Sequence, residues 1–132
     1  GLWTGNPYTT GAGVLVAASP DVEVVGNTIE DSGACVIAMQ QNRSSDGATF
    51  GPHMIANLNV HDNTCLVRLG RAGGAVQDTG DSAIFTSLNN RWQGNRYTIP
   101  STTAAPFFWQ NADRGWAAWQ GYGQDTTGSV TP

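Results

Sequence analysis

The sequence Trp3-Thr4-Gly5-Asn6-Pro7-Tyr8-Thr9 recurs later in the chain as Trp92-Gln93-Gly94-Asn95-Arg96-Tyr97-Thr98. The two copies match at Trp, Gly, Asn, Tyr and Thr. Between them lie two segments of similar pattern, residues 22–29 and 58–65, each with an Asn two residues before an apolar residue. Internal repeats of this kind indicate structural units that stack and share one core.

The repeated Asn residues are separated by intervals of 21, 36 and 32 residues: Asn6, Asn27, Asn63 and Asn95. The shortest interval predicts the bare repeat, and the longer ones predict inserted loops at residues 40–52 and 70–80, where turn-forming residues gather. Asn tolerates the left-handed backbone of a sharp bend, and equivalent Asn side chains of stacked units can hydrogen-bond to one another. We therefore expect the four Asn residues to form one column.

Apolar and polar residues alternate around each Asn, which predicts short strands with one buried face. The residues expected to face inward occupy equivalent positions of successive repeats: Val22, Val24, Ile29, Leu58, Val60, Cys65, Trp92 and Tyr97. Glu23 and His61 fall on the outward face. Trp3 shares the register of Val24, so we expect it in the core with Trp92. Further strands are expected at four apolar runs: residues 14–18, 35–39, 83–86 and 107–109.

Three short parallel strands for each repeat, stacked about 4.8 Å apart, predict an all-β fold of the parallel β-helix type. The pattern Val-x-Val-x-x-Asn-Thr-Ile at residues 22–29, after Gly-Val-Leu-Val at residues 13–16, resembles the repeats of the pectate-lyase-like superfamily. The resemblance covers about residues 3–110 and implies a short right-handed parallel β-helix of about four to five rungs. It also implies glycans as the ligand class, because such domains include polysaccharide lyases, glycoside hydrolases and carbohydrate-binding modules.

The end of the apolar pattern divides the chain into three parts. We expect residues 1–110 to form the β-helix coils, residues 111–123 a C-terminal cap, and residues 124–132 a polar tail or linker. Within the cap, Asp113 is expected to begin a short helix that carries Trp116 and Trp119 on one face. The first repeat has no equivalent cap before it, so we expect the chain to be attached to a further domain in the native protein.

Composition excludes several classes of partner. Only 12% of the residues are charged, the net charge is −4, and all six cationic residues are Arg. Without a basic cluster, neither nucleic acid nor a membrane is expected as a partner. His53 and His61 have no further ligands at metal-binding spacing, so we expect no metal and no cofactor.

Cys35 and Cys65 occupy different positions in the repeat. Stacking alone would not bring them together, so we expect two small buried side chains, although the sequence leaves a disulfide open. The ligand class implied by the resemblance predicts an extracellular, secreted protein.

The two predicted loops would flank the outer surface of one sheet and wall a groove. The residues expected to bind a ligand there are Arg43, Phe50, Arg71, Asp78, Asp81 and Trp109. Aromatic faces pack against sugar C–H groups, while Arg and Asp bind hydroxyls or uronate carboxylates through forked hydrogen bonds.

These residues favour a non-catalytic carbohydrate-binding module for a plant-type polysaccharide, whether xylan-, pectin- or glucan-like. Two alternatives remain open. One is the C-terminal part of a secreted polysaccharide lyase or glycoside hydrolase whose catalytic rungs lie upstream, and the other is a structural β-helix of a surface or tailspike-like assembly. The catalytic residues are unknown, because spacing alone selects no pair among the ten acidic residues.

Overall fold

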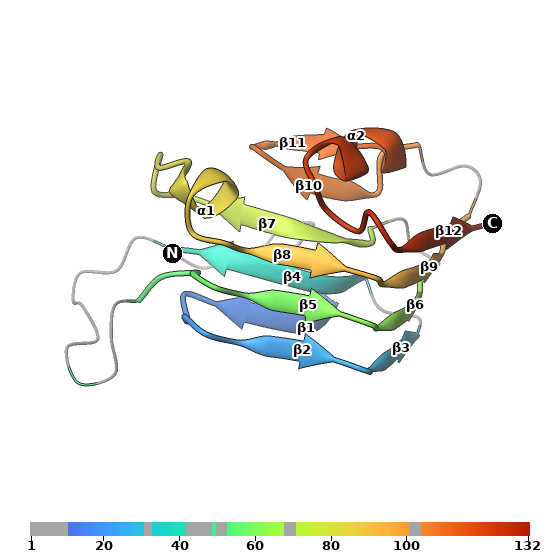
Figure 1. Ribbon diagram of the computed structural model, residues 1–132, viewed down its shortest axis with the longest axis horizontal. Coiled ribbons are helices and arrows are strands. Elements are labelled where there is room, and N and C mark those ends of the chain that lie inside the picture. Colours follow the sequence, from blue (N-terminus) through green and yellow to red (C-terminus); the bar gives the residue numbers. More distant parts are fainter. Residues whose placement is uncertain (1–10, 31–32, 42–48, 50–52, 68–70, 101–103) are drawn as a thin grey trace.

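The computed structural model describes residues 11–30, 33–41, 49, 53–67, 71–100 and 104–132, which form three small sheets and two short helices (Figure 1). The first sheet contains β1 (Ala12–Ala17), β4 (Ala34–Gln40), β7 (Gly73–Gln77), β10 (Phe107–Trp109) and β11 (Ala112–Arg114). The second contains β2 (Glu23–Val25), β5 (Asn59–His61) and β8 (Arg91–Gln93). The third contains β3 (Thr28–Glu30), β6 (Thr64–Leu66), β9 (Arg96–Thr98) and β12 (Ser129–Thr131). The helices are α1 (Ala83–Thr86) and α2 (Trp116–Gly121).

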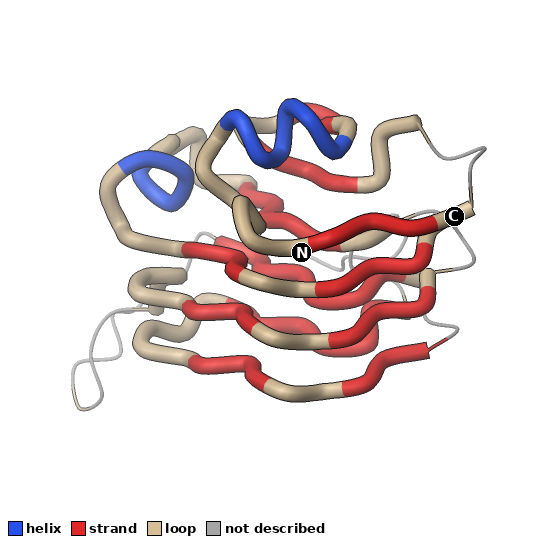
Figure 2. Tube along the Cα trace, turned by 45° about the vertical axis from the view of Figure 1, so that its right-hand side comes forward, coloured by secondary structure: helices blue, strands red, loops and turns tan. Residues whose placement is uncertain are grey.

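Neighbouring strands in each sheet come from successive repeats, and they pair in parallel except at β10 and β11 (Figure 2). The register aligns equivalent residues, as predicted: Val24 lies beside Val60, which lies beside Trp92. These three side chains are buried because alternate residues of a strand point to opposite faces. The period-two pattern around Asn27, Asn63 and Asn95 therefore identified the inward face correctly, whereas Trp3 and the repeat around Asn6 lie outside the described residues.

The predicted β-helix of about four to five rungs is wrong. The described strands form three small parallel sheets of five, four and three strands, and the described residues do not show these sheets closing into a solenoid. The largest sheet ends in an antiparallel pair, β10 and β11, which departs from a uniform parallel stack. Alternation and the Asn spacing specify which strands pair, but they carry no information on how separate sheets are joined.

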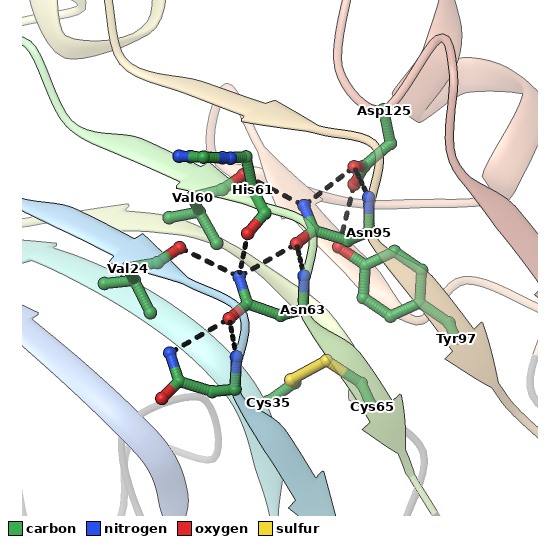
Figure 3. Close-up of a disulfide and its surroundings, with 10 residues drawn as sticks. Val24, Cys35, Val60, His61, Asn63, Cys65, Asn95, Tyr97 and Asp125 are labelled. Atoms are coloured by element: carbon green, nitrogen blue, oxygen red, sulfur yellow. Dashed lines mark hydrogen bonds between the residues drawn. A yellow bond between two sulfur atoms is a disulfide. The ribbon is translucent and has the colours of Figure 1, made fainter.

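The predicted column of Asn side chains is present among the described residues (Figure 3). The side-chain Nδ2 of Asn27 donates to Oδ1 of Asn63 at 3.0 Å, and Nδ2 of Asn63 donates to Oδ1 of Asn95 at 3.0 Å. Asp125 continues the column, since its Oδ1 accepts Nδ2 of Asn95 at 2.8 Å. The fourth predicted member, Asn6, lies outside the described residues.

Cys35 and Cys65 form a disulfide, which corrects the expectation that stacking would keep them apart. Cys35 belongs to β4 of the first sheet and Cys65 to β6 of the third, and both side chains enter the shared core. The bond therefore crosses the core between sheets (Figure 3). Disulfides persist in oxidising environments, so this bond fits such a compartment.

The C-terminal residues differ in detail from the predicted cap and tail. Asp113 lies in β11, and Gly115 is the N-cap of α2, so the helix begins later than expected. Trp119 of α2 is buried and stacks on Phe107 with ring centroids 4.7 Å apart. The segment expected to be a polar tail supplies β12, which pairs with β9. Neither described helix is long and apolar enough to cross a membrane.

Two predicted segments of the first sheet also change type. Residues 83–86 form α1 instead of a strand, because Oδ1 of Asp81 accepts the N–H of Ala83 at 2.9 Å and Nδ2 of Asn90 donates to the carbonyl of Ile84 at 3.0 Å. These bonds satisfy groups that a helix end leaves open. Residues 70–80, expected to be a loop, contain β7, which pairs with β4 and β10.

Candidate functional site

The outer face of the sheet formed by β2, β5 and β8 carries two columns of outward side chains. One column is Glu23, Asn59 and Arg91, and the other is Val25, His61 and Gln93. Their positions follow from the buried residue at the centre of each strand, because its neighbours must point outward. Five of these six outward side chains are polar, which makes the face hydrophilic.

A row of hydrogen-bonded side chains precedes the three strands. Asp21, Asn57 and Asn89 each have a left-handed backbone, with φ of 56°, 52° and 55°. Asn57 Nδ2 donates to Asp21 Oδ1 at 2.9 Å, and Asn89 Nδ2 donates to Asn57 Oδ1 at 3.1 Å. Nη1 of Arg91 also donates to Asn57 Oδ1, at 3.0 Å. This row is exposed, and its geometry is held by the parallel stacking of the turns.

The sequence contains a signal for this row in its residue intervals. Asp21, Asn57 and Asn89 are 36 and 32 residues apart, and Asn27, Asn63 and Asn95 show the same two intervals. Equal intervals mean equal positions in the repeat. The first row occupies the turn before the second sheet, and the other column occupies the turn after it.

His61 links two carboxylates on this face. Its Nε2 lies 2.8 Å from Oε1 of Glu23, and its Nδ1 lies 2.7 Å from Oδ2 of Asp62. Ionised carboxylates only accept hydrogen bonds, so both ring nitrogens donate when His61 is an imidazolium. The hydrogen bond to Asp62, followed by that to Glu23, raises the pKa of His61 above its ordinary value of 6.5.

The residues predicted to line a groove do not converge. Arg71 precedes β7, and its Nη1 lies 3.5 Å from Oδ1 of Asp113. Asp78 and Asp81 follow the other end of β7, roughly 20 Å away for a strand of this length. Asp81 caps the first turn of α1 instead of facing Arg71. A ligand-binding group built from all three is therefore not present.

Trp109 does not provide a stacking surface for a sugar. Its side chain is 1% exposed and lies in the core, with its ring centroid 5.7 Å from that of Trp92 and 5.6 Å from that of Trp119. A ring buried on both faces cannot contact a ligand, so this prediction is wrong. The other two predicted binding residues, Arg43 and Phe50, lie outside the described residues.

A hollow of about 230 Å³ lies between the end of β9 and α2. The residues that line it are apolar: Ile99, Pro100, Ala104, Pro106, Trp116, Val130 and Pro132. None of the described residues that line it is charged, so they do not supply the polar groups that fix the orientation of a small ligand. Within the described ranges, no three His, Cys, Asp or Glu side chains are close enough to hold a metal ion. The polar face of the second sheet is therefore the better candidate.

Likeness to known proteins does not reveal what this face binds. The predicted membership of the pectate-lyase-like superfamily stays a prediction from the repeat residues alone. No protein-family model, no curated protein and no solved structure matches this chain.

Proposed function

We propose that this chain is a non-catalytic carbohydrate-binding domain that binds a neutral glucan- or xylan-type polysaccharide on the outer face of β2, β5 and β8. One observation carries the proposal: hydrogen bonds between successive strands and turns already fix carboxylate, amide, imidazole and guanidinium groups on this face. Sugar hydroxyls both donate and accept hydrogen bonds. A surface that presents fixed donors and acceptors side by side is suited to them.

The hydrogen bonds that hold these side chains in fixed positions lower the conformational-entropy cost of binding a ligand. A flexible polar side chain loses rotamer freedom when it contacts a ligand, at about 0.5–1.5 kcal/mol for each side chain. Asn57 is already held by Asp21, Asn89 and Arg91, so little of this cost remains. Parallel strands repeat at about 4.8 Å, which gives the face a regular spacing that suits a polymer of repeated units.

Arg91 is the residue best placed to contact a sugar. Its Nη1 donates to Oδ1 of Asn57 and to the carbonyl of Asn89, both at 3.0 Å. A guanidinium has five N–H donors, so further donors remain for ligand hydroxyls. Arg91 therefore combines a fixed position with unused hydrogen-bonding capacity.

The charge of the face selects among the predicted polysaccharides. Asp21, Glu23 and Asp62 bring three carboxylates to it, against one guanidinium from Arg91. A polyuronate such as pectin would place further negative charges against these groups, which costs binding energy. The proposal therefore retains glucans and xylans and drops pectin as the ligand.

The engagement of His61 supports binding in preference to catalysis at this face. A general base needs a ring nitrogen that can accept a proton from the substrate. Both nitrogens of His61 lie within 2.8 Å of a carboxylate oxygen of Glu23 or Asp62. Secretion is part of the proposal, because an extracellular glycan and the Cys35–Cys65 disulfide both suit an oxidising exterior.

Affinity electrophoresis in gels containing xylan, a soluble β-glucan or polygalacturonate tests this proposal. The wild-type protein should be retarded by a neutral polysaccharide and not by polygalacturonate. Arg91→Ala should weaken the retardation about tenfold, the effect of losing roughly 1.4 kcal/mol of binding free energy. Arg96→Ala, an exposed Arg on the third sheet, is the matched control and should bind like the wild type.

Three outcomes would count against the proposal. Equal loss in both Arg variants would indicate a general charge effect, and the absence of retardation by either neutral polysaccharide would remove the proposed ligand. Release of new reducing ends or unsaturated uronates during incubation would instead support the predicted alternative of a hydrolase or lyase.

A further inference from the structure

Tyr122 presents an aromatic ring at the surface. It is 37% exposed, whereas the other aromatic side chains among the described residues are buried or half-buried. Gly121 and Gly123 flank it, and a Cβ added to either glycine would meet no heavy atom within 4 Å apart from neighbouring parts of the chain. The surface around Tyr122 is therefore open, in contrast to the surroundings of Trp109 in the core.

The position of Tyr122 is fixed from two directions. Its backbone N–H follows α2 and donates to the carbonyls of Ala118 and Trp119, at 3.1 and 3.2 Å. The guanidinium carbon of Arg114 lies over the ring, 5.1 Å from its centroid. Arg114 is itself held, because its Nε donates to the carbonyl of Trp109 at 2.9 Å. A cation over an aromatic ring is attracted to it, and this cation occupies one face of the ring.

Tyr122 lies near the β8 edge of the second sheet, because the residues that follow it run along this edge. Oε1 of Gln124 accepts the N–H of Trp92 at 2.8 Å. The N–H of Asp125 donates to the carbonyl of Trp92 at 2.7 Å. The views of Figure 1 and Figure 2 agree that the segment between α2 and β12 lies next to β8. Two residues span at most about 7 Å, so the backbone of Tyr122 is within that distance of Gln124.

We propose that Tyr122 is a sugar-stacking subsite at the β8 edge of the face formed by β2, β5 and β8. A pyranose ring packs its C–H groups against the face of Tyr122 opposite to Arg114, so the ligand does not touch β11. The subsite rests on the proposed function, since it takes further units of the same neutral polysaccharide. It supplies the flat aromatic surface that the outward side chains of β2, β5 and β8 lack.

The spacing of the strands sets the ligand length at which this subsite acts. Neighbouring strands lie about 4.8 Å apart, a step similar to the length of one pyranose unit. A trisaccharide that crosses β2, β5 and β8 ends before Tyr122, whereas a hexasaccharide extends past β8 and reaches the ring. Tyr122 therefore adds affinity for the longer ligand and none for the shorter one.

Isothermal titration calorimetry with xylotriose, xylohexaose, cellotriose and cellohexaose tests the subsite. Tyr122→Ala should bind the hexasaccharide about tenfold more weakly than the wild type and should keep the wild-type affinity for the trisaccharide. Tyr122→Phe retains the ring and should bind both ligands like the wild type. Leu15→Ala is the matched control, because it removes another exposed apolar side chain, from β1, and it should leave both affinities unchanged.

A second measurement does not depend on the folding of any variant. In the complex of the wild-type protein with the hexasaccharide, the ring protons of Tyr122 should show nuclear Overhauser contacts with sugar C–H protons.

The outcomes separate the subsite from the proposed function. Wild-type affinity of Tyr122→Ala for the hexasaccharide, or no Overhauser contact between the ring and the sugar, would overturn the subsite and leave the proposed function in place. Equal weakening of both ligands by Tyr122→Ala would also overturn it, because the ring would then add nothing specific to the longer ligand. If the wild type bound none of the four oligosaccharides, the proposed function would fail and the subsite with it.

Discussion

Asp125 accepts two hydrogen bonds from Asn95, through the backbone N–H at 3.0 Å and through Nδ2 at 2.8 Å. Its second oxygen accepts the hydroxyl of Tyr97 at 2.7 Å and the indole N–H of Trp119 at 2.9 Å. The carboxylate is fully buried, and these four donors offset the loss of its hydration. Burial, and then the charge of Asp125, raises the pKa of Tyr97 well above its ordinary value, so the phenol remains a donor. Asp125 thus joins the Asn column, the third sheet and α2.

Asp125→Asn should lower the free energy of unfolding by about 2–4 kcal/mol. An amide keeps one accepting oxygen and replaces the other with NH₂, which cannot accept the hydrogen bonds of Tyr97 and Trp119. Urea denaturation measures the change. Asp113→Asn, at an exposed carboxylate paired with Arg71, should cost less than about 1 kcal/mol, and equal losses in the two variants would contradict the role of Asp125.

Asn63→Ala should cost about 2–3 kcal/mol, because Asn63 is 0% exposed and its side chain bonds to Asn27, Asn95 and the carbonyl of Val24. Asn89→Ala in the exposed row is the comparison and should cost less than about 1 kcal/mol. Thermal and urea unfolding of both variants provide the measurement. If the two proved equally stable, the buried column would have no special part in holding the repeats together.

Removal of the disulfide should destabilise the protein by about 3–4 kcal/mol, from the chain entropy of a loop whose ends are 30 residues apart. The double variant Cys35→Ala, Cys65→Ala tests this, since the small apolar side chain is tolerated in a core. Reduced wild-type protein should unfold at a urea concentration close to that of the variant. No shift of the midpoint on reduction would show that the two thiols are not bonded in solution.

Stability should depend on the ionisation of His61. The folded state raises its pKa, so the interaction with Glu23 and Asp62 stabilises fully below about pH 6.5 and is lost as the pH rises through the higher folded value. The effect should stay below about 1 kcal/mol, because both carboxylates are largely exposed. His61→Gln should flatten the pH dependence between pH 6 and 8. A slope retained in His61→Gln would assign it to another group.

Local features of the fold could be predicted from the sequence because they repeat. Val24, Val60 and Trp92 share one position of the pattern, and the structure places them side by side in the core. The Asn column was also predicted, since Asn recurs at equivalent positions. The reason given for it was wrong, because the left-handed residue of each bend is the one before the Asn: Gly26, Asp62 or Gly94. These features depend on neighbouring repeats alone.

Features that depend on contacts between sheets could not be predicted this way. The Cys35–Cys65 bond joins different positions of the repeat across the core, so a comparison of equivalent positions does not reveal it. Asp125 was missed because it takes an Asn position with a different residue type, and Trp109 was placed on the surface because the packing of α2 was unknown. The equal sequence intervals between Asp21, Asn57 and Asn89 were a signal for the turns beside the candidate face. The pattern alone, however, does not distinguish an exposed turn from a buried one.

Binding of a neutral glycan to the face of β2, β5 and β8 is tested most directly by NMR titration of the isotope-labelled protein with xylo- or gluco-oligosaccharides. The NMR signals of the Asn57 and Asn89 side-chain amides, the Arg91 guanidinium and the His61 ring should change their chemical shifts. The backbone amide signals of β10 and β11 should not change. Saturable changes confined to this face would support the proposed function. Changes centred instead on the hollow beside Trp116, or no saturable change with either sugar, would contradict it.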